Sequence, residues 1–275
     1  MASRLEQIIA STRERVARSK AALSLQGLGD LSARAEQHVP RGFRSQLQKQ
    51  TSHGTAVIAE LKRASPSRGV IRENLEVAAT ARALEENGAA ALSILTDEKY
   101  FQGSLADLRE ASFATTLPCL RKDFIIDEFQ LVEAKAYGAD AVLLIVAAFS
   151  PEQDGELGRL GEGARNAGLD VLCEIHDEEE LARAINAGLA YSMIGVNNRN
   201  LKNFTVDLGC GERLGPLLPP RALRVAESGI HSASDIHLLR RAGYEAFLIG
   251  ELLMSADDPG ARLAGLLGEV RSKPR

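Results

Sequence analysis

From about residue 54 onward, the chain repeats a unit of one short apolar run, one polar or glycine-containing loop and one helical stretch rich in Ala, Leu, Glu and Arg. Short apolar runs between turn residues predict buried strands, and the periodic stretches predict helices. Eight such apolar runs occur, and they lie at Ala56–Leu61, Ala91–Leu95, Pro118–Leu120 continuing into Arg121–Lys122, Ala141–Val146, Val171–Ile175, Met193–Val196, Leu223–Ala226 and Ala246–Ile249.

The helical stretches share a glycine where they end, as at Gly88, Gly138, Gly188 and Gly243. Glycine is the common residue after the last helical turn because it adopts the left-handed conformation without a Cβ clash. Strands that alternate with helices indicate a parallel sheet covered by helices, which can be an open doubly wound sheet or a closed barrel. Eight regular units favour closure into a (β/α)8 TIM barrel.

An open sheet that binds a dinucleotide would normally carry a GxGxxG motif after its first strand. Here the first apolar run is followed by Arg63-Ala64-Ser65-Pro66-Ser67-Arg68-Gly69, which does not match that motif. Gly209-Cys210-Gly211 lacks the third glycine at the required spacing and follows no predicted strand. The sequence therefore argues against a dinucleotide site.

The first fifty residues differ from the repeated units. Apolar residues recur there at helical spacing, at Leu5, Ile8, Ile9 and Val16. This spacing predicts an amphipathic helix, which is followed by a second polar segment up to Gln50. We therefore expect an N-terminal helical extension over residues 1–53, packed on a barrel formed by residues 54–275, in a single-domain protein.

The composition is that of an ordinary globular protein, with 45% hydrophobic and 25% charged residues in 275. The formal net charge of -4 disfavours a nucleic-acid partner, which would select a basic surface. The longest apolar stretch, Ala139 to Phe149, is too short for a membrane span. Glu6 and Glu14 argue against an organelle transit peptide.

The cysteines and histidines form no metal-binding pattern. The cysteines are far apart and include no CxxC pair, so we expect reduced thiols in a cytoplasmic protein: Cys119, Cys173 and Cys210. The histidines form no HExxH motif, and we interpret them as structural or surface residues: His38, His53, His176, His231 and His237. No metal is expected.

Charged residues follow the apolar runs at the positions where a barrel of this kind carries its active site. Glu60 and Lys62 end the first run and, being two residues apart, point to the same face of a strand. An exposed ion pair is the alternative for these two residues. The other strand-end residues are Lys122, Glu174, Asn197 and Glu227. Charge pairing and burial shift pKa values in opposite directions, and this competition tunes acid–base residues.

The last two loops predict a phosphate site. Ser228 and Gly229 follow the seventh run and Gly250 follows the eighth, each just before a helical stretch. Backbone N–H groups at a helix start attract anions, and phosphate sites at strands seven and eight recur in this fold. The segment Ser65–Gly69 can add a hydroxyl and a cation from the first loop.

Six segments closely resemble the indole-3-glycerol phosphate synthase family of tryptophan biosynthesis. They occur in the family's order over most of the barrel, at residues 58–69, 95–104, 118–124, 174–181, 194–201 and 226–230. The resemblance implies the conversion of 1-(2-carboxyphenylamino)-1-deoxyribulose 5-phosphate to indole-3-glycerol phosphate, with loss of carbon dioxide and water and without a cofactor. The N-terminal helix is similar to the family's extra segment over the barrel mouth.

The resemblance also implies residue roles. Lys122 is the expected general acid for the ketone oxygen, and Lys62 holds the substrate carboxylate and can protonate the departing hydroxyl. Glu174 is the expected base in the dehydration. Glu60 and Glu227 would tune the lysines, and Asn197 would hold substrate hydroxyls. The remaining implied residues line the pocket for the aromatic ring, Phe101, Phe124 and Leu143, or the phosphate site, Ser65, Arg199, Ser228, Gly229, Gly250 and Glu251.

Glu251 departs from family members that have Ser after the glycine. We expect its carboxylate to point away from the phosphate and its backbone N–H to remain the contact. Two other functions stay open at this point: a Schiff-base aldolase using Lys122 or Lys62 as the nucleophile, and a catalytically silent barrel that serves as a scaffold. The expected partner is a small phosphorylated substrate, with neither nucleic acid nor membrane, and the chain is expected to be a monomer.

Overall fold

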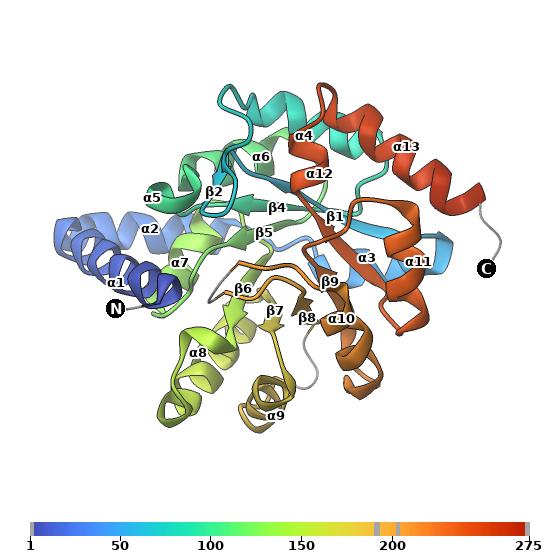
Figure 1. Ribbon diagram of the computed structural model, residues 1–275. Coiled ribbons are helices and arrows are strands. Elements are labelled where there is room, and N and C mark those ends of the chain that lie inside the picture. The colour runs from blue at the N-terminus through green and yellow to red at the C-terminus, as the bar shows by residue number, and fades with distance from the viewer. Residues whose placement is uncertain (1–2, 190–192, 202–203, 273–275) are drawn as a thin grey trace.

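The computed structural model describes residues 3–189, 193–201 and 204–272. Within them, parallel strands close into a barrel in the order β1-β10-β9-β8-β7-β6-β5-β4 (Figure 1). The barrel strands are β1 (Ala56–Leu61), β4 (Ala91–Leu95), β5 (Cys119–Lys122), β6 (Ala141–Ile145), β7 (Asp170–Ile175), β8 (Met193–Asn197), β9 (Leu223–Glu227) and β10 (Ala246–Ile249). The first strand pairs with the last, so the predicted TIM barrel is confirmed and the open sheet is wrong.

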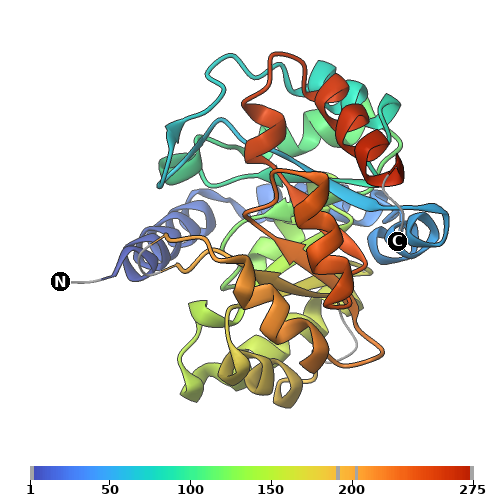
Figure 2. The same ribbon diagram turned by 45° about the vertical axis from the view of Figure 1, so that its right-hand side comes forward.

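The helices that follow the strands lie outside the barrel (Figures 1 and 2). They are α4 (Val77–Glu86), α6 (Leu105–Ala114), α7 (Phe129–Ala136), α8 (Asp154–Asn166), α9 (Glu178–Asn186), α10 (Leu208–Leu214), α11 (Ala233–Arg241) and α13 (Pro259–Ser272). Several of them are capped by a side chain: that of Asp177 accepts a hydrogen bond from the backbone N–H of Glu180 at the start of α9, which satisfies a helix-end donor.

The loops between strands and outer helices also contain short helical elements. They are the helices α5 (Glu98–Phe101) and α12 (Glu251–Met254), and the 3-10 turns η1 (Val146–Ala148), η2 (Pro151–Gln153) and η3 (Gly215–Leu217). An antiparallel hairpin, β2 (Ala64–Ser65) with β3 (Gly69–Val70), follows β1. The sequence analysis treated this segment only as a loop.

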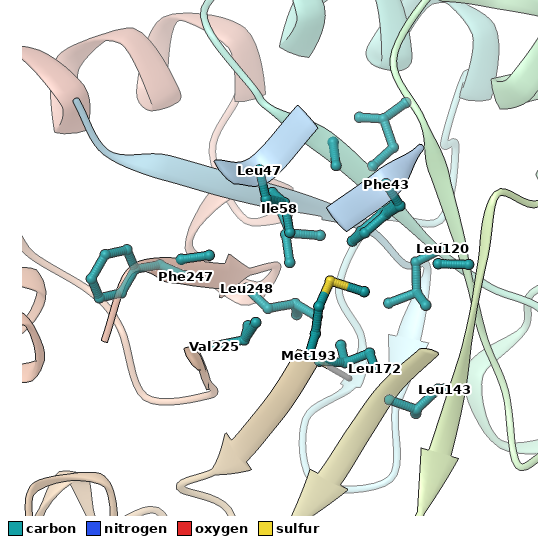
Figure 3. Packing of buried hydrophobic residues seen from close by; sticks show 14 of the residues in the cluster. Phe43, Leu47, Ile58, Leu120, Leu143, Leu172, Met193, Val225, Phe247 and Leu248 are labelled. Carbon is teal, nitrogen blue, oxygen red and sulfur yellow. The ribbon is translucent and has the colours of Figure 1, made fainter. Parts of the chain in front are cut away.

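Alternation along each strand decides which side chains face the barrel interior. In β1, Ile58 is buried and Glu60 follows two residues later; in β7, Leu172 is buried and Glu174 follows in the same way. The starts of these two strands therefore supply apolar filling, and their ends supply charge. Figure 3 shows the apolar layer, with Ile58, Leu120, Leu172, Met193, Val225 and Leu248 turned toward one another.

The N-terminal extension forms three helices, α1 (Arg4–Ala22), α2 (Leu25–Gln37) and α3 (Phe43–His53). The polar segment expected after the first helix thus forms two further helices. The Ser24 side chain caps the start of α2, and Gly42, with a φ of 72°, precedes the first residue of α3. Phe43 and Leu47 of α3 are fully buried, and they reach the start of the apolar barrel layer (Figure 3). The third helix therefore closes the barrel end opposite the strand-end charges.

Ion pairs fasten the extension at both ends of the barrel. At the closed end, Arg41 pairs with the buried Asp140, the residue before β6, at 2.5 Å. Burial raises the pKa of the Asp140 carboxyl, but hydrogen bonds from His38 and Arg41 outweigh it and lower that pKa. At the pocket end, Arg15 of α1 pairs with Asp123 at 2.7 Å, just after β5. In the described part of the chain, no helix is long and apolar enough to cross a membrane.

Candidate active site

A pocket opens at the carboxyl ends of the strands and has two connected lobes. One lobe contains ten of the predicted site residues: Glu60, Lys62, Ser65, Phe101, Lys122, Phe124, Leu143, Asn197, Arg199 and Ser228. The second lobe shares Glu60, Lys62, Lys122, Arg199 and Ser228 with the first and adds Glu227, Gly229, Gly250 and Glu251. Glu174 lies beneath Lys122, with its side chain 1% exposed.

Lys122 is held between two carboxylates. Its Nζ lies 2.7 Å from Oε2 of Glu174 and 3.2 Å from Oε2 of Glu227. Burial of the ammonium lowers the pKa of Lys122, but the negative charges of Glu174 and Glu60 outweigh burial and raise that pKa above its usual value. Lys122 therefore carries its proton throughout the neutral pH range and can donate it to a bound molecule.

The two carboxylates beside Lys122 have pKa values shifted in opposite directions. Burial raises the pKa of Glu174, but the positive charges of Lys122 and His176 outweigh it and leave the pKa lowered. For Glu227, burial and the neighbouring negative charge of Glu174 prevail over Lys122 and raise the pKa. At neutral pH, Glu174 is thus ionised while Glu227 keeps a proton. Such a separation of pKa values is typical of paired acid–base groups.

Two glycines make room for these carboxylates. A Cβ added at Gly195, in the middle of β8, would collide with Oε1 of Glu227. A Cβ added at Gly250, just after β10, would collide with the carboxylate of Glu60. The missing side chains at these two positions allow the glutamates to reach the pocket floor from neighbouring strands.

Glu60 and Lys62 form an ion pair of 2.7 Å whose side chains are 6% and 13% exposed. Both side chains line the pocket, so the exposed-pair alternative is wrong. Asn197 lies at the end of β8, where its Oδ1 accepts a hydrogen bond of 3.0 Å from the backbone N–H of Arg199. This bond fixes the start of the loop that carries Arg199.

The loop after β9 has two consecutive residues in the left-handed region, Ser228 with a φ of 64° and Gly229 with a φ of 77°. Such a backbone is costly for serine and turns successive N–H groups toward a common side, which suits an anion. The Asn198 side chain supports it by donating hydrogen bonds of 3.0 and 3.2 Å to the carbonyls of Glu227 and Ser228.

A cluster of charged loop residues borders this second lobe. Arg199 donates a hydrogen bond of 2.9 Å to Oγ of Ser67, in the hairpin turn after β1. Glu251 pairs with Arg68 at 2.6 Å and with Arg199 at 3.4 Å. The Glu251 carboxylate therefore lies between two guanidinium groups at the rim of the lobe. We refer to Ser67, Arg68, Arg199 and Glu251 as the rim cluster.

The first lobe has an apolar wall on the opposite side. The rings of Phe101 and Phe124 lie 6.5 Å apart, centroid to centroid, with 39° between their planes. Leu143 and Ile145 of β6 extend this wall. The wall suits a planar aromatic group, whereas the rim cluster and the glycine loops suit an anion.

Two contacts at the site were missed by the sequence analysis. His176, interpreted there as structural or surface, has its Nε2 3.5 Å from Oε1 of Glu174. Its position two residues after Glu174, on the same strand face, was the available signal. The pairing of Arg15 with Asp123 had no such signal, because the two residues are 108 positions apart in the sequence.

Comparison with known proteins identifies the family. A family model described as indole-3-glycerol phosphate synthase matches residues 5–266. The chain belongs to the indole-3-glycerol phosphate synthase family. It is 55% identical to the indole-3-glycerol phosphate synthase of Koribacter versatilis over 268 residues, which cover 98% of this chain and 100% of the relative. It is 45% identical to that of Rhodospirillum rubrum over 270 residues, with 98% and 100% coverage.

Membership in the indole-3-glycerol phosphate synthase family confirms the predicted family and the predicted class, a carboxy-lyase of tryptophan biosynthesis. It decides against the aldolase and scaffold alternatives. Solved structures resemble this chain in fold alone. They include a mandelate oxidase, with a TM-score of 0.59 and 21% identity over 78% of this chain and 72% of that chain. Another is a thiamine phosphate pyrophosphorylase from Pyrococcus furiosus, with a TM-score of 0.57 and 17% identity over 81% and 98%.

Proposed function

We propose that this chain converts 1-(2-carboxyphenylamino)-1-deoxyribulose 5-phosphate to indole-3-glycerol phosphate, and that the residues described above carry out the steps. One observation supports this most: a protonated Lys122, 13% exposed, lies between an ionised and a protonated carboxyl, in a pocket with an apolar lobe and an anion-binding lobe. The substrate has an aromatic end and a phosphate end, which match the two lobes.

In the first step, the ring carbon that bears the carboxylate attacks the substrate ketone. The ketone oxygen develops alkoxide character, which makes it more basic than a lysine amine, so Lys122 can transfer its proton although its pKa is raised. Phe101, Phe124 and Leu143 would hold the ring against the apolar wall. The wall orients the attacking carbon toward the ketone.

In the second step, the carboxylate leaves as carbon dioxide, and its bonding electrons restore the aromatic ring. Lys62 would hold this carboxylate until it leaves. Its ion pair with Glu60, at 2.7 Å, holds the Lys62 side chain at the wall of the pocket. The ring itself accepts the electrons, so the step needs no separate electron sink.

In the third step, the former ketone oxygen departs as water. Lys62 would protonate this hydroxyl, and Glu174 would remove the proton whose loss forms the indole double bond. Glu174 suits a base because its lowered pKa keeps it ionised. Glu227 would set the charge around Lys122, and Asn197 would hold the substrate hydroxyls.

The phosphate would bind in the second lobe. Gly229 and Gly250 expose backbone N–H groups there, and Ser65 and Arg199 would add a hydroxyl and a guanidinium from neighbouring loops. The backbone N–H of Glu251 would be a further donor. Ser228 would contribute its backbone beside Gly229.

We further propose a cytoplasmic monomer. The three cysteines are free, and most large exposed hydrophobic side chains of the described residues lie on separate elements, as Leu25, Val70 and Leu217 illustrate, while Val39 and Phe113 share one depression with several arginines. Scattered apolar residues do not form the continuous patch that a stable interface needs. Light scattering coupled to gel filtration should give one species near 29.6 kDa.

The activity is tested by incubating the purified chain with the carboxyphenylamino-deoxyribulose phosphate and recording indole fluorescence. We expect product to form with chelator present and without added cofactor. Borohydride added during turnover should leave no covalent adduct on either lysine. A folded protein that forms no product, or one trapped by borohydride, would refute the proposed function.

A further inference from the structure

The His176 imidazole is enclosed by carboxylates on both of its nitrogens. It follows β7 directly and is two residues after Glu174. Its Nδ1 lies 3.0 Å from Oε2 of Glu180 in the first turn of α9, and its Nε2 lies 3.5 Å from Oε1 of Glu174. The His176 side chain is 13% exposed, so little water separates it from these charges.

The protonation state of the ring follows from these contacts. A neutral imidazole has one N–H donor and one lone pair, so one nitrogen would point a lone pair at a carboxylate oxygen. The imidazolium form has a donor on each nitrogen and suits both neighbours. Oε2 of Glu180 also accepts the backbone N–H of His176 at 2.8 Å, which fixes the glutamate in place.

The surroundings of the ring favour the cation. Burial of the imidazole lowers the pKa of His176, but the hydrogen bond that the ring donates to Glu180 and the negative charges of Glu174 and Glu180 outweigh it and raise the pKa. From α10, Cys210 contacts only the backbone carbonyl of His176, at 3.2 Å, and the pKa of its thiol is raised by burial, so it brings no charge at neutral pH.

We propose that His176, as an imidazolium ion held by Glu180, is a positioning residue for Glu174. Its Nε2 faces Oε1 at 3.5 Å, an ion-pair distance without a hydrogen bond, and its charge attracts Oε1 while Oε2 stays 2.7 Å from the Nζ of Lys122. This inference rests on the proposed role of Glu174 as the base. Neither lobe is lined by His176 or Glu174. Glu174 meets the pocket beside Lys122, which lines both lobes, and His176 lies one contact further away, so we place its effect on Glu174 and not on the substrate.

The need for a second cation arises from the reaction itself. When Lys122 gives its proton to the ketone oxygen, the ion pair between Lys122 and Glu174 is lost for that interval. His176 then remains beside Glu174 and keeps the carboxylate ionised until the dehydration step. A carboxylate without this second cation would take up a proton more readily, and less of it would be available as a base.

The kinetic test compares His176→Gln and Glu180→Gln with Glu179→Gln as the matched control. Glu179 is exposed in the same first turn of α9 and carries the same charge. We expect His176→Gln to move the acidic limb of the kcat profile upward by about one pH unit, so that kcat falls by up to about tenfold at pH values below that limb and changes little near pH 7. Glu180→Gln should move the acidic limb in the same direction by a smaller amount, and Glu179→Gln should not move it. KM should change little in all three variants.

A spectroscopic test is independent of activity. In the ¹⁵N-histidine NMR spectrum of the unmodified chain, the signal lost in His176→Gln should show both ring nitrogens protonated at pH 7. If that variant does not fold, Glu180→Gln should shift the same signal toward the neutral ring. A neutral ring at pH 7, or an acidic limb unmoved in both variants, would overturn the proposal. If the unmodified chain makes no product, the proposed function is refuted. The protonation state of His176 is still tested in that case, because the NMR spectrum does not depend on turnover.

Discussion

The two lobes of the pocket are built in different ways. The acid–base groups Lys122, Glu174 and Glu227 are strand residues placed by the register of the barrel, and the two glutamates are buried. The rim cluster comes from loops that connect different strands, and Arg68 is 63% exposed. Chemistry that needs fixed distances is thus placed on the rigid sheet, and recognition of a mobile phosphate is placed on loops.

This difference predicts that changes in the strand groups alter mainly kcat, and that changes in the rim cluster alter mainly KM. Loss of an interaction that is made only in the transition state lowers kcat, whereas loss of an interaction that binds the substrate equally in the ground state raises KM. The following substitutions test the comparison.

Lys122→Ala should have the largest effect. It removes the proton donor and the cation shared by Glu174 and Glu227, so we expect kcat to fall by about 10²–10⁴-fold while KM changes far less. Steady-state indole fluorescence measures both values. Lys49→Ala, at an exposed position on α3, is the control and should leave kcat unchanged. Near-normal turnover of Lys122→Ala would remove the general-acid role.

Gly195→Ala should come next. The added methyl group occupies the space of the Glu227 carboxylate and displaces it from Lys122, so kcat should fall about tenfold or more, with a loss of stability of about 1–3 kcal/mol. Gly268→Ala is the control, because a Cβ there meets open space in α13 and should stabilise the helix. Thermal unfolding and kinetics together check this. An unchanged kcat would show that the position of Glu227 is not important.

Arg199→Ala should show the opposite pattern. It removes a guanidinium from the phosphate lobe, so KM should rise about tenfold, the size expected for one charge-assisted hydrogen bond, while kcat stays within about twofold. Arg213→Ala, at an exposed site on α10, should leave KM unchanged. If Arg199→Ala lowered kcat as strongly as it raised KM, the division between the lobes would not hold.

Glu251→Gln should have the smallest effect and lower KM. Its carboxylate neutralises part of the charge of Arg68 and Arg199, and removing it should strengthen phosphate binding about two- to fivefold, within the range of partly exposed ion pairs. Inhibition by inorganic phosphate should tighten in parallel, and both changes should shrink at high salt. Glu269→Gln is the control on α13. A rise in KM would mean that Glu251 serves to orient the arginines.

The sequence was sufficient to predict the barrel and the strand-end groups, because both depend on local alternation. Once Leu172 faces inward, Glu174 must do so as well. The same rule could have found His176. It could not find the pairing of Arg68 with Glu251 or of Arg15 with Asp123, because loops have no periodicity and their contacts depend on tertiary packing. The second and third helices of the extension were missed because their apolar stripes are narrow and their caps, Ser24 and Gly42, resemble loop residues.

The extension is held by Arg15 at the pocket end and by Arg41 at the closed end of the barrel. Between them lie two helices and two short connections, at residues 23–24 and 38–40. A residue inserted in a connection adds little loop-closure entropy, so we expect both ion pairs to survive it. Loss of either arginine would instead release one end of the segment from the barrel.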